Sequence, residues 1–389
     1  MKVKASDKNI TIPKSQKKAE ILKMAQHREY LYKHPQLKSL FLEMTLNCNE
    51  HCRHCGSWCG DVKVNGTLSD DEIKNFLKEL KDDLDKRQQK LPFLNITGGE
   101  PLVRKGVVPL MKYAHDELGY HWGMTTNGLL IDKEMAKALK DAGMYSVSIS
   151  VDGLEETHDW FRRSKNGYKK AIQALENLVE VKIPNVMATT VVHRRNICEL
   201  DELYPIMKDL KIDCWRVINV EPIGRAKEND EISLNPIDYK YIIDFIKKHR
   251  AEDNEMEIAY GCNHYLGPEY EKEIRPWYFL CNAGTYVAGI HYNGDIGACL
   301  DIERLPETIQ GNIRKDHFID VWENKFEIYR QDKTVNSPEC SKCKHRFECG
   351  GDGFHTWDVK TCKPRLCLYK EIKAVKAYEK AKKKLDNGK

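Results

Sequence analysis

Short apolar segments rich in β-branched residues alternate with charged, amphipathic segments over residues 40–220. The amphipathic segments, such as residues 70–84 and 168–181, have helical apolar spacing, and Ser69 begins a helix-capping sequence. Strands that alternate with helices form parallel βαβ units. The sequence therefore predicts an α/β fold, a partial (β/α)6 TIM-like barrel. Its strands are expected at residues 40–46, 93–97, 121–126, 146–151, 186–192 and 215–220.

A polar or glycine-rich motif accompanies the end of each predicted strand. NCNEHCRHC follows the first strand, GGEP the second and NG the third, and the next three run into SVDG, HRRN and EPIGRA. In folds of this class the active site lies at the carboxyl ends of the strands, where these motifs would meet. Gly, Asn and Asp also favour ordinary turns, but six such motifs on one rim together predict a single site.

The first motif places four cysteines, Cys48, Cys52, Cys55 and Cys59, within twelve residues. A disulfide, a zinc site or an iron–sulfur cluster would each explain thiols this close together. The N-terminus lacks the apolar core of a signal peptide, and no apolar run is long enough to span a membrane. We therefore expect a cytoplasmic protein with no membrane partner. Disulfides are rare in that reducing compartment, where clustered cysteines usually bind metal or carry out redox chemistry.

The C-x3-C-x2-C spacing of Cys48, Cys52 and Cys55 favours an iron–sulfur cluster over zinc. A structural zinc site usually takes four ligands with paired spacing, and a ferredoxin cluster takes four thiolates. Three thiolates leave one iron of a [4Fe–4S] cluster without a protein ligand, which is useful only if another molecule binds there. Cys59 has no place in the motif, and we expect it to be a free thiol.

The thiol motif after the first strand, with GGEP after the second, resembles the radical S-adenosylmethionine (SAM) enzymes. The resemblance covers about residues 40–370. It implies that the amino and carboxylate groups of SAM bind the open iron of the [4Fe–4S] cluster. The reduced cluster would then cleave SAM to methionine and a 5′-deoxyadenosyl radical, which abstracts a hydrogen atom from the substrate. In such enzymes the cofactors carry the chemistry and the protein positions them.

The resemblance also implies which residues after the second and third strands serve SAM. Gly98 and Gly99 permit a close backbone approach. Glu100 is expected to accept hydrogen bonds from the SAM ammonium group, and Asn127 is expected to face the site.

The resemblance implies further contacts with SAM from residues that follow the fourth strand. Ser150 and Asp152 resemble the positions that contact the SAM ribose. Arg162 matches an arginine that pairs with the SAM carboxylate, and Arg163 is an equal candidate by sequence. His54 stands where the family usually has a large aromatic residue beside the adenine, and an imidazole can also stack there.

The cysteines of the C-terminal region resemble the ligands of a SPASM domain, which carries two auxiliary [4Fe–4S] clusters. The resemblance implies an outer cluster and an inner one nearer SAM. A cysteine that the pattern expects is replaced by Gly353, so the inner cluster is left one ligand short or uses another thiol such as Cys262. The expected ligands are Cys340, Cys343, Cys349 and Cys367 for the outer cluster, and Cys281, Cys299 and Cys362 for the inner one. Cys198 and Cys214 are expected in the core.

The predicted organisation has four parts. These are a helical N-terminal extension (1–38), a radical SAM partial barrel (39–245), a SPASM auxiliary-cluster domain (246–375) and a Lys-rich helical tail (376–389). The net charge of +4 is mildly basic, and no RNA-binding motif is present, so we expect no nucleic-acid partner. The lysine-rich ends favour solvated helices over a surface for an acidic peptide.

Proteins with this two-domain plan mostly modify peptides or proteins. The leading hypothesis is a radical SAM oxidoreductase that forms a thioether or carbon–carbon cross-link in a ribosomally made precursor peptide, with a flavodoxin or ferredoxin-like electron donor. An alternative is a sulfatase-maturase-like dehydrogenase that converts Cys or Ser of a partner protein to formylglycine. That reaction needs a general base, and the sequence does not choose among several candidates that include Asp352 and His355. A zinc-binding module without catalysis is a remote alternative, because it does not explain the rim motifs.

Overall fold

The computed structural model describes residues 13–60, 64–227, 229–253, 255–261 and 264–386. Seven parallel strands lie in chain order in this part of the protein. They are β1 (Ser39–Glu43), β2 (Phe93–Thr97), β3 (Trp122–Thr126), β4 (Met144–Ser150), β5 (Asn185–Val192), β6 (Cys214–Asn219) and β7 (Glu257–Tyr260). The predicted parallel α/β fold is confirmed, with all six expected strands present. The four-residue β7 was not predicted, because so short a segment carries little periodicity.

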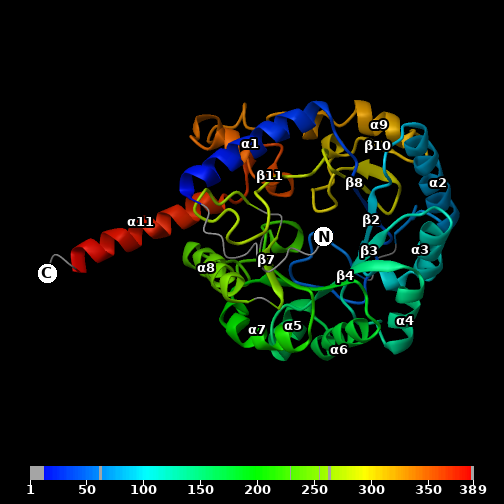
Figure 1. The fold of residues 1–389 in the computed structure, drawn as a ribbon, viewed down its shortest axis with the longest axis horizontal. Helices are drawn as coiled ribbons and strands as arrows, with labels where there is room; N and C mark the ends of the chain where they lie inside the picture. The colour runs from blue at the N-terminus through cyan, green and yellow to red at the C-terminus, as the bar shows by residue number, and fades with distance from the viewer. Residues whose placement is uncertain (1–12, 61–63, 228, 254, 262–263, 387–389) are drawn as a thin grey trace.

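Helices connect these strands and form the outer wall (Figure 1). Helix α2 begins with the expected capping box, in which Ser69 and Glu72 exchange hydrogen bonds. Its buried face carries Ile73, Leu77 and Leu80, at the spacing of one helical stripe. The wall consists of α2 (Asp70–Lys86), α3 (Val107–Asp116), α4 (Lys133–Asp141), α5 (Glu155–Arg162), α6 (Gly167–Glu180), α7 (Leu200–Asp209) and α8 (Pro236–Glu252).

The cysteine-rich region continues the barrel sheet. Strand β8 (Val287–Ile290) pairs in parallel with β1, and its Ala288 lies opposite Leu40. Strands β9 (Asp295–Gly297) and β10 (Gly311–Asn312) follow as antiparallel neighbours. The remaining elements are α9 (Phe318–Asn324), α10 (Arg346–Cys349), the hairpin of β11 (Trp357–Asp358) and β12 (Lys363–Pro364), and α11 (Leu368–Asp386). The boundary that we expect at residue 245 stays a prediction.

The N-terminal helix α1 (Lys14–Lys33) packs on the cysteine-rich region. Arg28 donates to the backbone carbonyls of Phe347 and Glu348 in α10. Ile21 lies in a small apolar cluster with Tyr265, Tyr278 and Phe279. Helix α11 packs against α8 at its start, and its later turns project from the body (Figure 1). Helices α1 and α11 fall within the two segments expected to be helical, but α1 is anchored by packing rather than surrounded by solvent.

One apolar core joins the two regions. Leu40 and Leu42 of β1 belong to the same buried cluster as Ile290 of β8 and Trp322 of α9. Continuous packing of this kind holds the cysteine-rich region in a defined position beside the barrel rim. No helix among the described residues is long and apolar enough to cross a membrane.

Candidate active site

The loop after β1 carries the three motif thiols. It folds back on itself, because the Cys48 backbone N–H donates to the Gly60 carbonyl at 3.0 Å. Arg225, which follows β6, clamps the loop from the other side by donating to the carbonyl oxygens of Cys52 (2.7 Å) and Cys59 (2.9 Å). Residues far apart in sequence therefore hold Cys48, Cys52 and Cys55 at the barrel rim, where all three line one cavity.

The motif thiols do not form a group compact enough to be identified as a site for a single metal ion. A zinc ion with bonds of about 2.3 Å to sulfur brings its ligand atoms to within about 4 Å of one another. Within the described residues, Glu79, Asp83 and His317 form the one group of three possible ligands whose atoms all lie within 4.8 Å. No three described cysteines meet that criterion. The thirteen described cysteines are also free of disulfides.

Gly98 and Gly99 bring the end of β2 against the thiol loop. The Gly99 N–H donates to the Thr45 carbonyl at 2.7 Å, and a Cβ at Gly99 would lie 2.1 Å from the Asn47 oxygen. Gly98 has a φ of +140°, and a Cβ there would lie 2.4 Å from the Thr45 oxygen. The predicted close backbone approach is thus an approach to the protein's own loop. Both glycines also line the cavity.

Glu100 is buried beneath the rim and joins β2 to β3. Its carboxylate accepts hydrogen bonds from the Thr126 hydroxyl (2.8 Å) and from the backbone N–H groups of Asn127 (2.9 Å) and Leu102 (3.1 Å). Burial raises its pKa to about 7, against the lowering effect of these donors. Glu100 is not among the residues that line the cavity, whereas Asn127 is. Its contact with SAM stays a prediction.

The cavity has a volume of about 350 Å³ and opens at the carboxyl ends of the strands. Ser150, Thr189 and Arg216 stand at matching positions of β4, β5 and β6 and line its wall. Asp301 and His355 from the cysteine-rich region complete it. The predicted site residues that line it are Cys48, Cys52, His54, Cys55, Gly98, Gly99, Asn127, Ser150 and Arg162.

The two arginine candidates face different ways. Arg162 lines the cavity and forms buried ion pairs, from Nε to Asp152 Oδ2 at 2.8 Å and from Nη1 to Glu50 Oε2 at 2.9 Å. Asp152 is fully buried and also accepts a hydrogen bond from the Val191 N–H. Arg163 ends α5 in the left-handed conformation and lies on the outer side of the loop, beside Cys48 and His51. Only Arg162 of this pair is therefore placed to meet a ligand in the cavity.

His54 takes part in an aromatic stack at the cavity wall. Its ring lies parallel to that of Phe161, with centroids 4.2 Å apart, and Phe161 stacks on His193 at 3.9 Å. Burial lowers the pKa of His54 well below its usual value, so the ring is neutral at physiological pH. A neutral, flat imidazole at this position suits the stacking role that we expect for it.

Cys59, expected to be a free thiol, lies at the site. It is buried, lines the cavity and donates its backbone N–H to the Cys55 sulfur at 3.4 Å. The hydrogen bond between the Cys59 and Cys55 side chains lowers the pKa of Cys55 to about 6 and raises that of Cys59. Cys198 differs from expectation, because it lies exposed in the turn before α7, where its thiol meets the Arg195 carbonyl. The thiol of Cys214, in β6, is half-buried.

The expected outer ligand set is brought together around α10 and the start of α11. Cys343 acts electrostatically on Cys340, Cys340 on Cys367, and Cys367 on Cys349. These four thiols therefore lie near one another. Segments from residues 340–349 and 367 thus converge although the sequence separates them. Their assignment as cluster ligands stays a prediction.

The expected inner ligands come from three separate segments of the cysteine-rich region. The Cys281 sulfur accepts a hydrogen bond from the Phe354 N–H at 3.4 Å, and Cys299 is two residues from the cavity-lining Asp301. Cys362 lies before β12, where its thiol meets the Val359 carbonyl. Gly353 stands where the pattern expects cysteine, and a Cβ there would lie 2.7 Å from the His355 ring. Cys262 lies outside the described residues.

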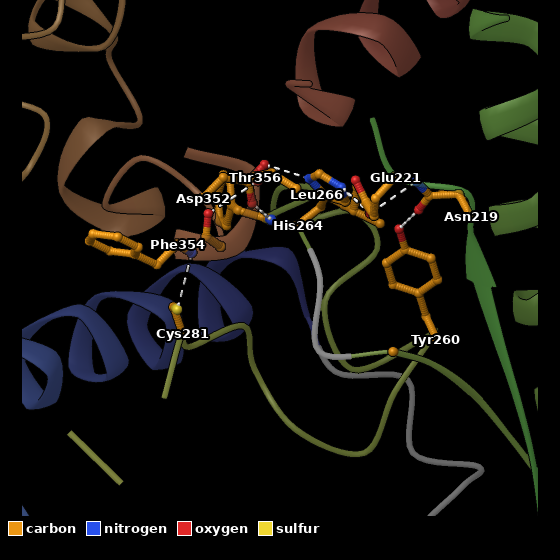
Figure 2. A network of polar contacts seen from close by, with 12 residues as sticks. Asn219, Glu221, Tyr260, His264, Leu266, Cys281, Asp352, Phe354 and Thr356 are labelled. Carbon is orange, nitrogen blue, oxygen red and sulfur yellow. Dashed lines mark hydrogen bonds and ion pairs between the residues drawn. The ribbon is translucent and has the colours of Figure 1, made fainter. Parts of the chain in front are cut away.

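A buried polar network that the sequence did not reveal joins the cavity to the cysteine-rich region (Figure 2). His264 lies between two carboxylates, with Nε2 2.8 Å from Glu221 Oε1 and Nδ1 2.7 Å from Asp352 Oδ2. Burial lowers the pKa of His264, but the two carboxylates outweigh it and raise the pKa to about 10, so the ring is cationic. Glu221 lines the cavity, whereas Asp352 does not. From the sequence, the motif EPIGRA, which begins with Glu221, predicted only that this residue lies on the rim.

Comparison with known proteins agrees with this geometry. Residues 42–204 match the model of the radical SAM superfamily, and residues 281–344 match the SPASM iron–sulfur cluster-binding domain. The AdoMet-dependent heme synthase of Methanosarcina barkeri is 30% identical over 79% of this chain and 89% of its own length. The PqqA peptide cyclase of Bradyrhizobium diazoefficiens is 27% identical over 80% of each chain.

A solved structure shares the fold at lower identity. SuiB of Streptococcus suis, solved with bound S-adenosylmethionine, superposes with a TM-score of 0.65 at 19% identity, covering 82% of this chain and 73% of its own. These families bind a SAM-ligating [4Fe–4S] cluster, SAM and auxiliary clusters, and three thiols at a cavity rim suit the first of these. The protein is therefore an enzyme of the radical SAM superfamily with a C-terminal SPASM domain.

Proposed function

We propose that this enzyme oxidises a ribosomally made precursor peptide and forms a thioether or carbon–carbon cross-link in it. One observation carries the proposal. The barrel rim and the cysteine-rich region line the same cavity, through Ser150 and Arg162 on one side and Asp301 and His355 on the other. A substrate in this cavity would lie between the motif thiols and the expected inner-cluster thiols.

That position suits a net two-electron oxidation. The cluster and SAM, when bound, supply the abstraction of one hydrogen atom, and the second electron needs an acceptor on the other side of the substrate. The expected ligand Cys299 is two residues from the cavity-lining Asp301. Glu221 and Asp301 provide carboxylates at the cavity for the proton that leaves with the second electron.

The comparisons support a peptide substrate at the level of the family. One relative is named as a peptide cyclase, and SuiB has also been solved with its precursor peptide SuiA. Because a peptide is long, most of it would stay outside a cavity of about 350 Å³ and only the reacting side chains would enter.

The test is incubation of the reduced, reconstituted enzyme with SAM and the small peptide encoded beside its gene. We expect the peptide to lose two hydrogen atoms, read by mass spectrometry, with a new cross-link located by fragmentation. A Cys48→Ala/Cys52→Ala/Cys55→Ala variant serves as the control and should leave the peptide unchanged. SAM cleavage by the wild type without any change in peptide mass would contradict the proposal. An aldehyde at a single Cys or Ser would instead identify the formylglycine reaction.

A second candidate is heme synthesis, which the 30% identity to an AdoMet-dependent heme synthase favours. Arg216 and Arg225 line the cavity and suit the carboxylates of a porphyrin. The test is addition of Fe-coproporphyrin III, the product for which another relative is named, under the same conditions. Conversion of Fe-coproporphyrin III to heme, separated by chromatography and identified by mass, would favour this candidate over the peptide reaction.

A further inference from the structure

Three lysines from separate segments of the chain line a surface pocket. Two of these segments, α1 and the start of α11, meet on one side of the molecule (Figure 1). The three lysines are Lys18 of α1, Lys344, which directly follows Cys343, and Lys373 of α11, and we call them the lysine patch. All three are exposed. The pocket between them has a volume of about 270 Å³, and His345 and Tyr369 contribute to its floor.

The charges of the lysine patch are only partly offset, because Glu348 acts on His345 together with the three lysines and Glu269 lines the same pocket. Within the described residues, no carboxylate lies within ion-pair distance of Lys18, Lys344 or Lys373. At the adjoining end of the same pocket, by contrast, Lys14 and Lys376 both pair with Glu269. The three lysines all act electrostatically on His345, so they lie close to one another. Such a group attracts an anionic surface.

Two residues that line the pocket, His345 and Tyr369, connect it to the expected outer-cluster ligands. The His345 ring meets the Tyr369 hydroxyl at 2.7 Å. The Cys343 and Cys367 thiols act electrostatically on Tyr369, so they lie next to its ring. The lysine patch therefore lies near Cys343 and Cys367 of the expected outer ligand set. It is built from other elements than the catalytic cavity, with which it shares no lining residue.

We propose that the lysine patch is the docking surface for an acidic one-electron carrier that exchanges electrons with the outer auxiliary cluster. The proposal rests on the assignment of these four thiols as cluster ligands and on the oxidative chemistry of the proposed function. In that chemistry the second substrate electron must leave the enzyme. The reduced cluster loses one electron and returns to its oxidised state, and an oxidised flavin carrier gains one electron and one solvent proton to become a semiquinone. A carrier with a negative surface would be steered to this position by charge.

The test mixes dithionite-reduced enzyme, freed of excess reductant, with oxidised flavodoxin and follows semiquinone formation by stopped-flow absorbance. In a Lys18→Glu/Lys344→Glu/Lys373→Glu variant we expect the second-order rate constant at low ionic strength to fall at least about tenfold. The wild-type rate should fall as salt is added, whereas the rate of the variant should change little. Binding of flavodoxin, measured by calorimetry, should weaken in parallel.

A matched control changes the same charge elsewhere. Lys78, Lys170 and Lys211 are exposed on or beside the barrel helices, and their triple Glu variant should keep the wild-type rate within about twofold. Iron content and oxidation by a small neutral quinone should be equal in all three proteins, which shows that the clusters are intact.

Equal flavodoxin rates in the two triple variants, or a wild-type rate that does not depend on salt, would overturn the proposal. The proposal would also be overturned if the Lys18→Glu/Lys344→Glu/Lys373→Glu variant kept its rate with flavodoxin but no longer bound a fluorescent poly-glutamate peptide. The lysine patch would then be a binding surface for an acidic peptide. The assay contains no substrate peptide, so its outcome is independent of whether the enzyme cross-links one.

Discussion

The Nε2 atom of His264 lies 2.8 Å from the Oε1 atom of Glu221, and this contact joins the SPASM side of the molecule to the barrel rim. The other ring nitrogen meets Asp352, 88 positions further along the chain. A cationic imidazole between two buried carboxylates balances charges that burial would otherwise make costly. The cavity wall at Glu221 is consequently coupled to the segment that carries the auxiliary thiols.

Replacement of His264 should destabilise the protein. In a His264→Asn variant two buried carboxylates lose their shared cation, at a cost on the order of 3–5 kcal/mol. We expect a lower urea midpoint for unfolding, measured by circular dichroism. A Glu221→Gln/His264→Asn double variant should lose less than the sum of the two single variants, because the two side chains interact directly. Additive losses would show that the contact contributes little.

Substitution of Gly99 should remove the SAM-binding cluster selectively. A Cβ at this position would lie 2.1 Å from the Asn47 oxygen, so the Gly99→Ala variant must displace the thiol loop. We expect a loss of about four irons per chain with the auxiliary clusters retained. Gly56→Ala is the matched control in the same loop, since its Cβ would approach only the flexible Ile223 side chain, at 3.3 Å. Full iron content in Gly99→Ala would contradict the expectation.

Iron and sulfide analysis should count the clusters. Three [4Fe–4S] clusters predict about twelve irons per chain, falling to about eight in the Cys48→Ala/Cys52→Ala/Cys55→Ala variant. A wild-type content of about eight irons per chain that falls to about four in the triple variant would mean that one auxiliary site is empty. The replacement of an expected ligand by Gly353 would then be the reason. Zinc without iron would exclude the radical mechanism.

Glu100 should make stability depend on pH near neutrality. The pKa of Glu100 is about 7 in the folded protein, whereas the ordinary pKa of a glutamate side chain is 4.5. Between these values the folded state keeps a proton that the unfolded state has released, so stability falls as pH rises through this window. The slope from this one group is at most about 1.4 kcal/mol per pH unit.

The measurement for Glu100 is the urea midpoint between pH 5 and pH 8. The wild type should lose stability over this range relative to a Glu100→Gln variant, and the difference in slope should shrink once the pH exceeds the folded pKa of about 7. Gln cannot accept all three hydrogen bonds that reach the Glu100 carboxylate, so the variant will be less stable throughout. Only the difference in slope tests the pKa, and equal slopes would contradict it.

Local patterns predicted much of the barrel. Alternating apolar segments located β1 to β6, and the spacing of Cys48, Cys52 and Cys55 predicted a three-thiol site at the rim. These features depend on neighbours within a few residues, where periodicity and turn chemistry are strong. The pairing of β8 with β1 was not predictable in this way, because it joins segments about 250 residues apart.

The sequence also did not predict the direction in which side chains point. Arg162 and Arg163 were equal candidates, and only the end of α5 in the left-handed conformation turns Arg163 outward while Arg162 meets Asp152 and Glu50. Likewise Asp352 and His355 were both possible bases. In the structure, Asp352 contacts His264, whereas His355 lines the cavity.

The sequence by itself determined the parallel barrel, the rim on which the site lies and the family to which the chain belongs, because strand periodicity and thiol spacing are local properties. The tertiary structure alone decided which charges are paired and which lysines gather near the outer thiols. Glu221 with His264, and Lys18 with Lys344 and Lys373, come together only when distant segments pack. Packing of the whole chain, rather than any short pattern, selects such partners, because a buried or clustered charge is favourable only with its neighbours in place.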